Sequence, residues 1–454
     1  MLIITLISCN AGLDRDSTLA ELPDTASPDT TPTSGTASAV LQLLPDLPTV
    51  IEVTWPSDRV GPGIVQFRTD DGPWRNTPPA KEVEGGFRQL VLGVPYDTNV
   101  DVRLLPDGGD PSAATTIRTG AWPESLPVPI VLKNDPALWE PTAPWLITSM
   151  NRDGDPRTGK WWVFIMDRAG QVVWAQETSL DWVSRHVSVS YDQRALLIDR
   201  DTFWTLFDGG DASTIERTTL DGVISHSYDV PGLHHPFVPL PDGVIAWGEA
   251  DNGSESLQKV HLNGVQEEIW HCADWRESLG LGAGCGSNAL WWDEKTDRFL
   301  FSFWSSDTVV EIDHATGTAL RWFGNAPGSW SFDPPESQFW WQHGAVYTEA
   351  GTLLVSTKDQ LPADETIVRE YRLNETTQTL EEVWNFGEDR GIFGPYMGEA
   401  HRLPNGNTLH VYGAGGHLAE ATPSGEVAWE VTWKGDKHNG RTTPWLDLYD
   451  LLPD

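Results

Sequence analysis

Cysteine and basic residues are scarce in this chain. Its 454 residues include only three cysteines, and 30 Lys and Arg stand against 66 Asp and Glu, which gives a formal net charge of −36. An acidic excess of this size repels polyanions, so it argues against nucleic acid and against an anionic membrane surface as electrostatic partners. A chain this long holds about two or three domains and can bury a large core, so it needs no disulfide framework to fold.

Long hydrophobic runs and helical periodicity are also missing. Beyond the N-terminus no stretch reaches the ~18 apolar residues that span a bilayer. No apolar pattern with the 3.6-residue period of a helix persists over a useful length. Short apolar runs alternate instead with turns rich in glycine and proline, of which the chain has 42 and 33. These features predict an all-β protein.

The N-terminus resembles an export signal. Cys9 ends the apolar run MLIITLISC, which is similar to a bacterial lipoprotein signal, whose cysteine is lipidated and becomes the mature N-terminus. Only eight residues precede Cys9 and none is basic, whereas secretory signals are longer and begin with positive charge. Residues 10–38 are rich in Asp, Thr, Ser, Pro and Ala and predict a disordered tether after the signal 1–9. We therefore expect an exported protein, lipid-anchored through Cys9 to the cell envelope, in the periplasm or at the cell surface.

The two remaining cysteines are Cys272 and Cys285. If lipid occupies Cys9, they form an even pair within one loop of an exported protein, which predicts a disulfide. Two free buried thiols are the alternative.

Residues 39–136 contain short alternating runs separated by Pro, Gly and Asp turns. The runs are VIEVTW, IVQFR, FRQLVL and NVDVRLL. Their spacing predicts a small antiparallel β-sandwich. The segment LGVPYDTNVDVR (92–103) resembles the tail of a fibronectin type III module.

One phrase repeats from Trp145 onward: an Asp or Asn, a Gly turn, and an apolar strand that often ends in Trp. The copies are DRAGQVVW (167–174), LDGVISHS (220–227), LNGVQEEIW (262–270), DHATGTALRW (313–322), LNETTQTLEEVW (373–384) and TPSGEVAWE (422–430). Repeats of about 45–60 residues made of four short strands are typical of propeller blades. The sequence thus predicts a six-bladed β-propeller over 137–454. We expect the 24 tryptophans to pack between blade faces, with aryl-ligand binding as the alternative.

Histidines recur at one position of these repeats. His343 lies eight residues before the turn glycine of its repeat, and His235 and His186 keep the same spacing to their turns. The innermost strands of a propeller surround a central channel, so these rings and Asn288 are candidates to converge there. His401 lies only five residues before its glycine, which predicts a deeper position. Each ring alone could equally be a hydrogen-bonded structural residue.

Convergent imidazoles support two kinds of chemistry. They could bind a transition metal, but no His-x-His or Glu-x-x-His pair accompanies them and no carboxylate recurs at their position. These absences argue against a metal, and we predict none. The imidazoles could instead perform nucleophilic group transfer and stabilise an anion.

Several phrases resemble one enzyme family. They are FWWQHGAV, HHPFVPLPDG, GSNALWW and GEAHRLPNGNTLHVYG, and together they are similar to the bacterial arylsulfate sulfotransferases and their arylsulfotransferase-like superfamily. The resemblance implies a ping-pong reaction without metal or nucleotide, in which a channel histidine takes a sulfuryl group from an aryl sulfate and passes it to a phenol. By motif, His343 is the nucleophile that becomes sulfohistidine. His235 hydrogen-bonds the sulfuryl oxygens, with Asn288 beside it.

The chain departs from the family pattern at two positions. Gly286 stands where the family's His-x-Asn phrase has histidine, and Trp304 stands where an arginine is expected. Charge or hydrogen bonds for the substrate could come instead from His186, Lys358 and His401, which we include as substrate-binding candidates. The departures favour an alternative, a catalytically decayed propeller that binds a ligand or protein at the cell surface. The small aromatic sulfate or phenol is the partner that the resemblance implies.

Overall fold

The computed structural model describes residues 39–452 except 59, 153, 156, 158–159, 180–181, 203–210, 252–253, 283, 360–363 and 436. The predicted signal with Cys9 and the tether 10–38 lie outside the described residues. Within the described part, one short helix, α1 (Cys272–Ser278), and a few 3-10 turns accompany a chain that is otherwise strands and loops. The predicted all-β class is confirmed.

Two four-stranded sheets form the N-terminal part. The strands in pairing order are β1 (Val40–Leu44), β2 (Leu47–Pro56), β6 (Gly86–Val91) and β5 (Lys81–Val83) in one sheet, and β4 (Arg75–Pro79), β3 (Gly63–Thr69), β7 (Asn99–Pro106) and β8 (Thr115–Arg118) in the other. Alternate residues of β2 and β3 are buried, as expected for strands with one face on a core. Val53 and Trp55 of the first sheet share that core with Phe67 and Val102 of the second. The two sheets therefore pack face to face.

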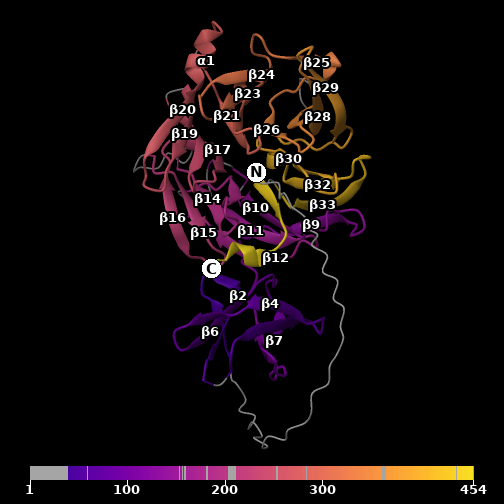
Figure 1. Cartoon of the computed structure of the whole chain (residues 1–454). Helices are drawn as coiled ribbons and strands as arrows, with labels where there is room; N and C mark the ends of the chain where they lie inside the picture. The colour runs from indigo at the N-terminus through magenta and orange to yellow at the C-terminus, as the bar shows by residue number, and fades with distance from the viewer. Residues whose placement is uncertain are drawn as a thin grey trace, which may run out of the picture.

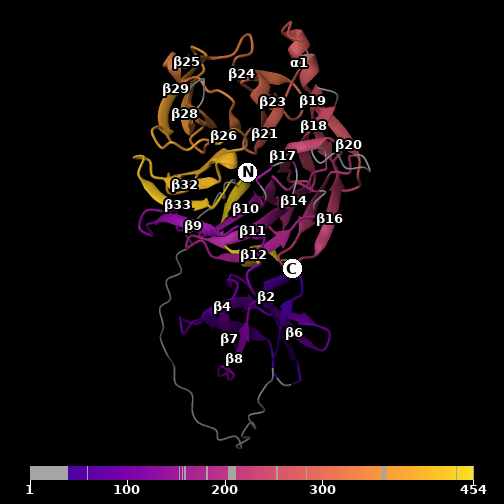
Figure 2. The same ribbon diagram turned by 180° about the vertical axis from the view of Figure 1, so that it is seen from behind.

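Six further sheets, mostly of four antiparallel strands, follow one another around a common centre (Figures 1 and 2). The first three, in pairing order, are β34 (Asn439–Trp445), β10 (Trp145–Asn151), β11 (Trp161–Asp167) and β12 (Val172–Glu177); β13 (Val187–Val189), β14 (Leu196–Arg200), β15 (Thr214–Thr218) and β16 (Ile224–Asp229); and β17 (Leu233–Pro239), β18 (Ile245–Asp251), β19 (Ser254–Val260) and β20 (Gln266–His271). β34, from the end of the described chain, pairs antiparallel with β10 and joins the last part of the chain to the first of these sheets.

The other three sheets complete the set. They are β21 (Ser287–Asp293), β22 (Arg298–Phe303), β23 (Thr308–Asp313) and β24 (Ala319–Gly324); β26 (His343–Tyr347), β27 (Leu353–Lys358), β28 (Thr366–Asn374), β29 (Thr379–Phe386) and the parallel strand β25 (Ser331–Asp333); and β30 (Glu399–Arg402), β31 (Thr408–Val411), β32 (His417–Ala421), β33 (Val427–Trp433) and β9 (Pro129–Asn134).

Each of the six repeated phrases forms a hairpin between the last two antiparallel strands of its own repeat. The phrase at 167–174 shows why. Asp167 Oδ1 accepts hydrogen bonds from the backbone N–H groups of Ala169 at 2.9 Å and Gln171 at 2.8 Å, while Gly170 adopts a φ of 78°. An acidic or amide side chain that binds its own backbone, followed by a residue free to take positive φ, makes a tight turn. The phrase that recurs in the sequence therefore marks the hairpin turn that recurs in the structure.

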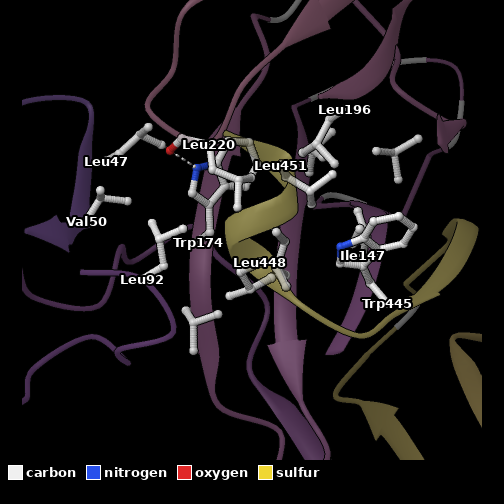
Figure 3. Close-up of a cluster of buried hydrophobic side chains, with 14 of the residues drawn as sticks. Leu47, Val50, Leu92, Ile147, Trp174, Leu196, Leu220, Trp445, Leu448 and Leu451 are labelled. Carbon is white, nitrogen blue, oxygen red and sulfur yellow. Dashed lines mark hydrogen bonds between the residues drawn. The ribbon is translucent and has the colours of Figure 1, made fainter. Parts of the chain in front are cut away.

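The N-terminal sheets pack on the outer edge of the first of the six sheets (Figure 3). Leu47 and Leu92 share a buried cluster with Trp174 of β12 and with Leu448 near the end of the chain. Trp174 Nε1 donates a 3.0 Å hydrogen bond to the backbone oxygen of Leu220. The sandwich thus supports the outside of the ring.

Cys272 and Cys285 form the predicted disulfide, with their Cα atoms 6.5 Å apart. The bond ties the first residue of α1 to the segment that leads into β21. The predicted disulfide is confirmed, although Cys272 lies in a helix and not in a loop.

Removing this disulfide is expected to destabilise the ring without affecting its centre. In the chain-entropy model, a loop of this length contributes about 3 kcal/mol to the free energy of unfolding. The double variant Cys272→Ala/Cys285→Ala should therefore unfold at a lower urea concentration than the wild type. Its unfolding midpoint should equal that of the wild type measured under reducing conditions. An unchanged midpoint would contradict the expectation.

No helix in the described part of the chain is long and apolar enough to cross a membrane.

Candidate functional site

The six sheets enclose a central cavity, and one end strand of every sheet contributes to its wall. The contributing polar residues are Arg441 on β34, Arg185 and His186 just before β13, His235 on β17, Asn288 on β21, His343 on β26 and Glu399 on β30. The cavity has an inner part of about 60 Å³ and a wider outer part of about 580 Å³. Three of the predicted residues, His343, His235 and Asn288, line both parts.

His343 is held by a rigid strand start. The preceding Gln342 is fully buried, and its Nε2 donates to Ser302 Oγ at 3.1 Å and to the backbone oxygens of Phe303 at 3.1 Å and Thr308 at 3.2 Å. These acceptors belong to the neighbouring sheet. They fix the backbone at 342 and hence the position from which the His343 side chain leaves β26.

The protonation state of His343 follows from its contacts. Nδ1 lies 3.2 Å from the backbone oxygen of Trp341, and a carbonyl can only accept, so Nδ1 carries the proton. Burial, together with the positive charge of Lys358, lowers the pKa of His343 to about 3. The ring is therefore neutral at physiological pH, with the lone pair on Nε2.

This state predicts a flat pH profile for any reaction in which His343 is the nucleophile. A histidine with its ordinary pKa of about 6.5 loses its lone pair as the pH falls through that value. Because the pKa of His343 is depressed, the neutral form persists down to about pH 4. The rate of sulfuryl uptake from p-nitrophenyl sulfate should stay level from about pH 8 to about pH 5, measured by quenched flow with nitrophenol read in alkali. A decline centred near 6.5 would contradict this assignment.

His235 and His186 also occur as neutral rings. Burial and then the charge of Arg185 lower the pKa of His235 well below its ordinary value. Burial and the neighbouring Arg441 do the same for the pKa of His186. Arg441 Nη1 donates a 2.9 Å hydrogen bond to His186 Nε2, and the His186 ring packs at 4.1 Å on Phe237.

Asn288 presents a hydrogen-bonding edge to the cavity. Its Nδ2 donates a 2.6 Å hydrogen bond to the backbone oxygen of Gln342, which ties β21 to the start of β26. Its Oδ1 is buried and has no hydrogen-bond partner among the described residues. A bound hydroxyl group could supply that missing donor.

Lys358 and His401, two predicted substrate-binding residues, do not line the cavity. The Lys358 ammonium donates to Thr366 Oγ1 at 3.0 Å and to the backbone oxygen of Gly394, and burial lowers its pKa to about 7. His401 Nε2 lies 3.1 Å from Oε1 of Glu399, which is the residue of β30 that lines the wall. Lys358 acts on the cavity only through its charge near His343.

Two guanidinium groups, those of buried Arg185 and half-buried Arg441, lie at the wall of the cavity. Arg185 lines both parts of the cavity and its Nη1 lies 3.7 Å from Asp201 Oδ2. Arg441 Nε lies 3.0 Å from Glu399 Oε2. Neither arginine was among the residues predicted from the sequence. For Arg185, the available signal was that it directly precedes the predicted His186. Arg441 gave no such signal, because it lies in the closing strand, outside the six repeats.

The mouth of the cavity is aromatic. Trp304 and Trp341 line the outer part and are 48% and 39% exposed, with Tyr396 beside them. Trp341 adopts a φ of 45°, a left-handed conformation that is unfavourable for a large side chain. These two tryptophans are exceptions to the expectation that tryptophan serves inter-blade packing.

Gly286 and Trp304 fit one another. A Cβ atom on residue 286 would lie 3.1 Å from Trp304 Nε1 and 3.0 Å from Ser305 Oγ. The indole therefore occupies the space into which a side chain at 286 would extend. A side chain at 286 would meet both Trp304 and Ser305.

Among the described residues, no group of three or more His, Cys, Asp or Glu side chains is arranged to hold a metal ion.

Comparisons with known proteins agree with the motifs. The family model for arylsulfotransferase (ASST) matches residues 286–443. No curated protein matches the chain.

Among solved structures, the chain is similar to a protein of unknown function from Bacteroides caccae, with 15% identity over 66% of this chain and 100% of that one and a TM-score of 0.44. It is also similar to virginiamycin B lyase from Staphylococcus aureus, at 11% identity over 69% and 99% with a TM-score of 0.41. A putative 6-phosphogluconolactonase from Bacteroides uniformis shows 11% identity over 84% and 99% with a TM-score of 0.41. The lyase and lactonase-like neighbours are β-propellers.

Proposed function

We propose that this protein transfers a sulfuryl group from an aryl sulfate to a phenol through a sulfohistidine formed on His343. The observation that carries the proposal is a neutral imidazole, with Nδ1 committed to the Trp341 carbonyl, in a cavity that Arg185 also lines. An imidazole in this state is a good nucleophile, and a nearby guanidinium favours an anionic group at the same place. The family match over residues 286–443 supports the same chemistry.

The proposed reaction has two half-reactions. The Nε2 lone pair of His343 attacks sulfur, and the bond from sulfur to the aryl oxygen breaks to release a phenolate. The acceptor phenol then loses its proton to a base as its oxygen attacks the same sulfur, the bond from sulfur to Nε2 breaks, and its electron pair returns to His343. Arg185 compensates the negative charge of the sulfuryl oxygens in both steps.

The mouth supports an aromatic substrate. Trp304, Trp341 and Tyr396 offer ring faces at the entrance of an outer cavity of about 580 Å³, and stacked aromatic pairs add stabilisation beyond the burial of their surface. A single phenyl ring is small relative to this volume, so the outer part also has room for a substituted or fused aromatic group.

The experiment is incubation with p-nitrophenyl sulfate in the absence of acceptor. Nitrophenol should appear as a burst stoichiometric with protein, and mass spectrometry should find one added SO₃ on a peptide that contains His343. Absence of both products with several aryl sulfates would overturn the proposal.

A second candidate function is ligand binding without catalysis. It is favoured by Gly286 and Trp304, which replace two polar partners of the family pattern by an aromatic wall. In that case aryl sulfates would quench the fluorescence of the exposed tryptophans and be released unchanged.

The proposed context is a lipoprotein with a signal at 1–9, a tether at 10–38, a fibronectin-like or Ig-like sandwich at 39–136 and a six-bladed propeller at 137–454. Within the sandwich range, β9 (Pro129–Asn134) pairs with β33 and so belongs to the ring. Lipidation of Cys9 would anchor it to the cell envelope. Cys9→Ser should then release the protein from the membrane fraction, and an unchanged distribution would contradict the anchor.

A further inference from the structure

Trp341 has an unfavourable backbone conformation two residues before the proposed nucleophile. Its φ of 45° lies in the left-handed region, which large side chains rarely adopt. The residues on either side of it are anchored. Trp340 donates its backbone N–H to Thr357 Oγ1 at 2.8 Å, and the side chain of Gln342 donates to atoms of β22 and β23. A strained residue of this kind persists only where its surroundings hold it, and such residues cluster at functional sites.

A carboxylate from the neighbouring sheet holds the backbone N–H of Trp341. Asp307 Oδ1 accepts this N–H at a distance of 2.7 Å. Asp307 Oδ2 accepts a hydrogen bond from Asn325 Nδ2 at 3.1 Å, and the Asp307 backbone oxygen accepts one from the Asn325 N–H at 3.0 Å. Asp307 is half-buried and stands between β22 and β23. Its side chain is therefore fixed on the sheet that faces the start of β26.

The carbonyl group of Trp341 determines where the proton of the His343 ring lies. Trp341 O accepts the Nδ1–H of His343 at 3.2 Å, and this bond leaves the lone pair on Nε2. In a neutral imidazole either nitrogen can carry the proton, so the partner of one nitrogen decides the state of the other. The N–H and the carbonyl of Trp341 are linked by only two backbone dihedrals. A change in the conformation of Trp341 would therefore move the carbonyl away from the ring.

We propose that Asp307 is a positioning residue for the nucleophile. By holding the N–H of Trp341, it keeps the Trp341 carbonyl where that oxygen receives the Nδ1 proton of His343. The proposal rests on the sulfuryl transfer proposed above and adds the residue that keeps the Nε2 lone pair available for attack. Asp307 is not among the described residues that line the cavity, so it acts on His343 through Trp341.

The same contact places the aromatic mouth relative to the nucleophile. The side chain of Trp341 lines the outer part of the cavity. Asp307 also donates its backbone N–H to the backbone oxygen of Trp304 at 3.3 Å, and Trp304 is the other exposed tryptophan of the mouth. One residue thus bonds to the backbones of both tryptophans. An aryl ring stacked on either indole would lie in a fixed position relative to His343 Nε2.

The test is Asp307→Gly. Asp307 has a φ of 46°, and glycine adopts such a conformation without strain, so the variant removes the carboxylate and keeps the turn. The burst of nitrophenol from p-nitrophenyl sulfate should slow by about 10- to 100-fold, the loss expected for a misplaced reacting group. Asp307→Asn should restore the burst rate to within about threefold of the wild type, because an amide oxygen also accepts an N–H and asparagine tolerates positive φ.

The ring of His343 gives a second readout that needs no turnover. Long-range proton–nitrogen correlation spectra of protein with isotope-labelled histidine distinguish a protonated ring nitrogen from one with a lone pair, and His343→Gln assigns the signals. The wild type and Asp307→Asn should carry the proton on Nδ1. Asp307→Gly should show a mixture of the two neutral tautomers, because the carbonyl that selects one of them is no longer held.

Asp297→Gly is the matched control. Asp297 lies in the same sheet, between β21 and β22, and has a φ of 52°. Its Oδ1 accepts a hydrogen bond from Trp292 Nε1 at 2.9 Å and lies 2.8 Å from His314 Nδ1. None of these three residues is among the described residues that line the cavity. The control should lower the urea midpoint about as Asp307→Gly does, with the burst and the His343 spectrum of the wild type.

The outcomes separate this proposal from the proposed function. Equal slowing of the burst in Asp307→Gly and Asp297→Gly overturns the positioning role, and so does an unchanged His343 spectrum in Asp307→Gly. Equal slowing in Asp307→Asn and Asp307→Gly overturns it as well, since the amide keeps the acceptor oxygen. A wild type that forms no adduct overturns the transferase function, while the tautomer spectra still decide whether Asp307 holds the ring.

Discussion

Replacement of His343 by Ala is expected to abolish both nitrophenol release and the SO₃ adduct. The same Nε2 lone pair serves the two half-reactions, and no other histidine that lines the cavity lies at the start of β26. Removal of a covalent nucleophile typically costs about 10⁴-fold or more in rate. The burst with p-nitrophenyl sulfate and the mass of the His343 peptide measure the loss directly.

Imidazole added in solution distinguishes a nucleophile from a structural residue. His343→Ala leaves a gap that opens on a lined cavity, and free imidazole can enter it and attack the bound aryl sulfate. Nitrophenol release should then return with no adduct on the protein, because the sulfuryl group leaves on the added imidazole. His186→Ala is the matched control, since this ring lines the inner cavity just before β13 and should still permit the adduct. An adduct in His343→Ala would show that another residue is the nucleophile.

The ring of sheets was predictable because its signal is local. Five of the six repeats contain a turn made by an Asp or Asn side chain and a residue of positive φ, and the sixth uses Thr422 and Gly425. Such turns depend on a few neighbouring residues. The hairpin at Asp167 and Gly170 illustrates this with hydrogen bonds that span four residues. The positions of His343, His235 and Asn288 followed from the same repeat, because equivalent strands place equivalent residues on one wall.

The rest of the wall was not predictable, because it depends on register. β26 contains a register shift between His343 and Ala345, and β21 contains one at Asn288, which adds a residue before the hairpin turn. The pairing of β30 has no such shift, so Glu399 lines the wall and His401 lies beyond it. An extra residue in a strand leaves no dependable mark in the sequence.

Sequence reasoning also missed the positive charge of the site for a physical reason. Arg441 belongs to β34, which reaches the first sheet only when the ring closes. That contact joins residues as far apart in the chain as Trp145 and Trp445, and no local pattern encodes it. Lys358 and His401 were predicted as sources of charge because they lie within the repeats. In the structure the charged groups at the wall are Arg185 and, on β34, Arg441.

Restoring the two family residues should show strong coupling between positions 286 and 304. Gly286→His alone forces its Cβ to 3.1 Å from Trp304 Nε1, and overpacking of this kind costs about 1–3 kcal/mol. Gly286 does not have a positive φ, so space rather than backbone conformation opposes the substitution. Trp304→Arg alone should change stability little, because the indole is 48% exposed. In the double variant the contact with the indole is gone, while the contact with Ser305 Oγ at 3.0 Å remains, so part of the lost stability should return.

The wild type, the two single variants and the double variant also test how the site works. The double variant places a histidine and a guanidinium beside the His343 cavity, and restored hydrogen-bond donors to an anion typically contribute about 10²–10³ in rate. We expect the burst rate to rise in the double variant only, while the KM for aryl sulfate also rises because an aromatic wall has been lost. Urea unfolding should give a coupling energy of about 0.5–3 kcal/mol. Additive stabilities would contradict the packing of Trp304 over Gly286. A recovered fold with an unchanged burst rate would mean that Arg185 and Arg441 already supply the charge that the reaction uses.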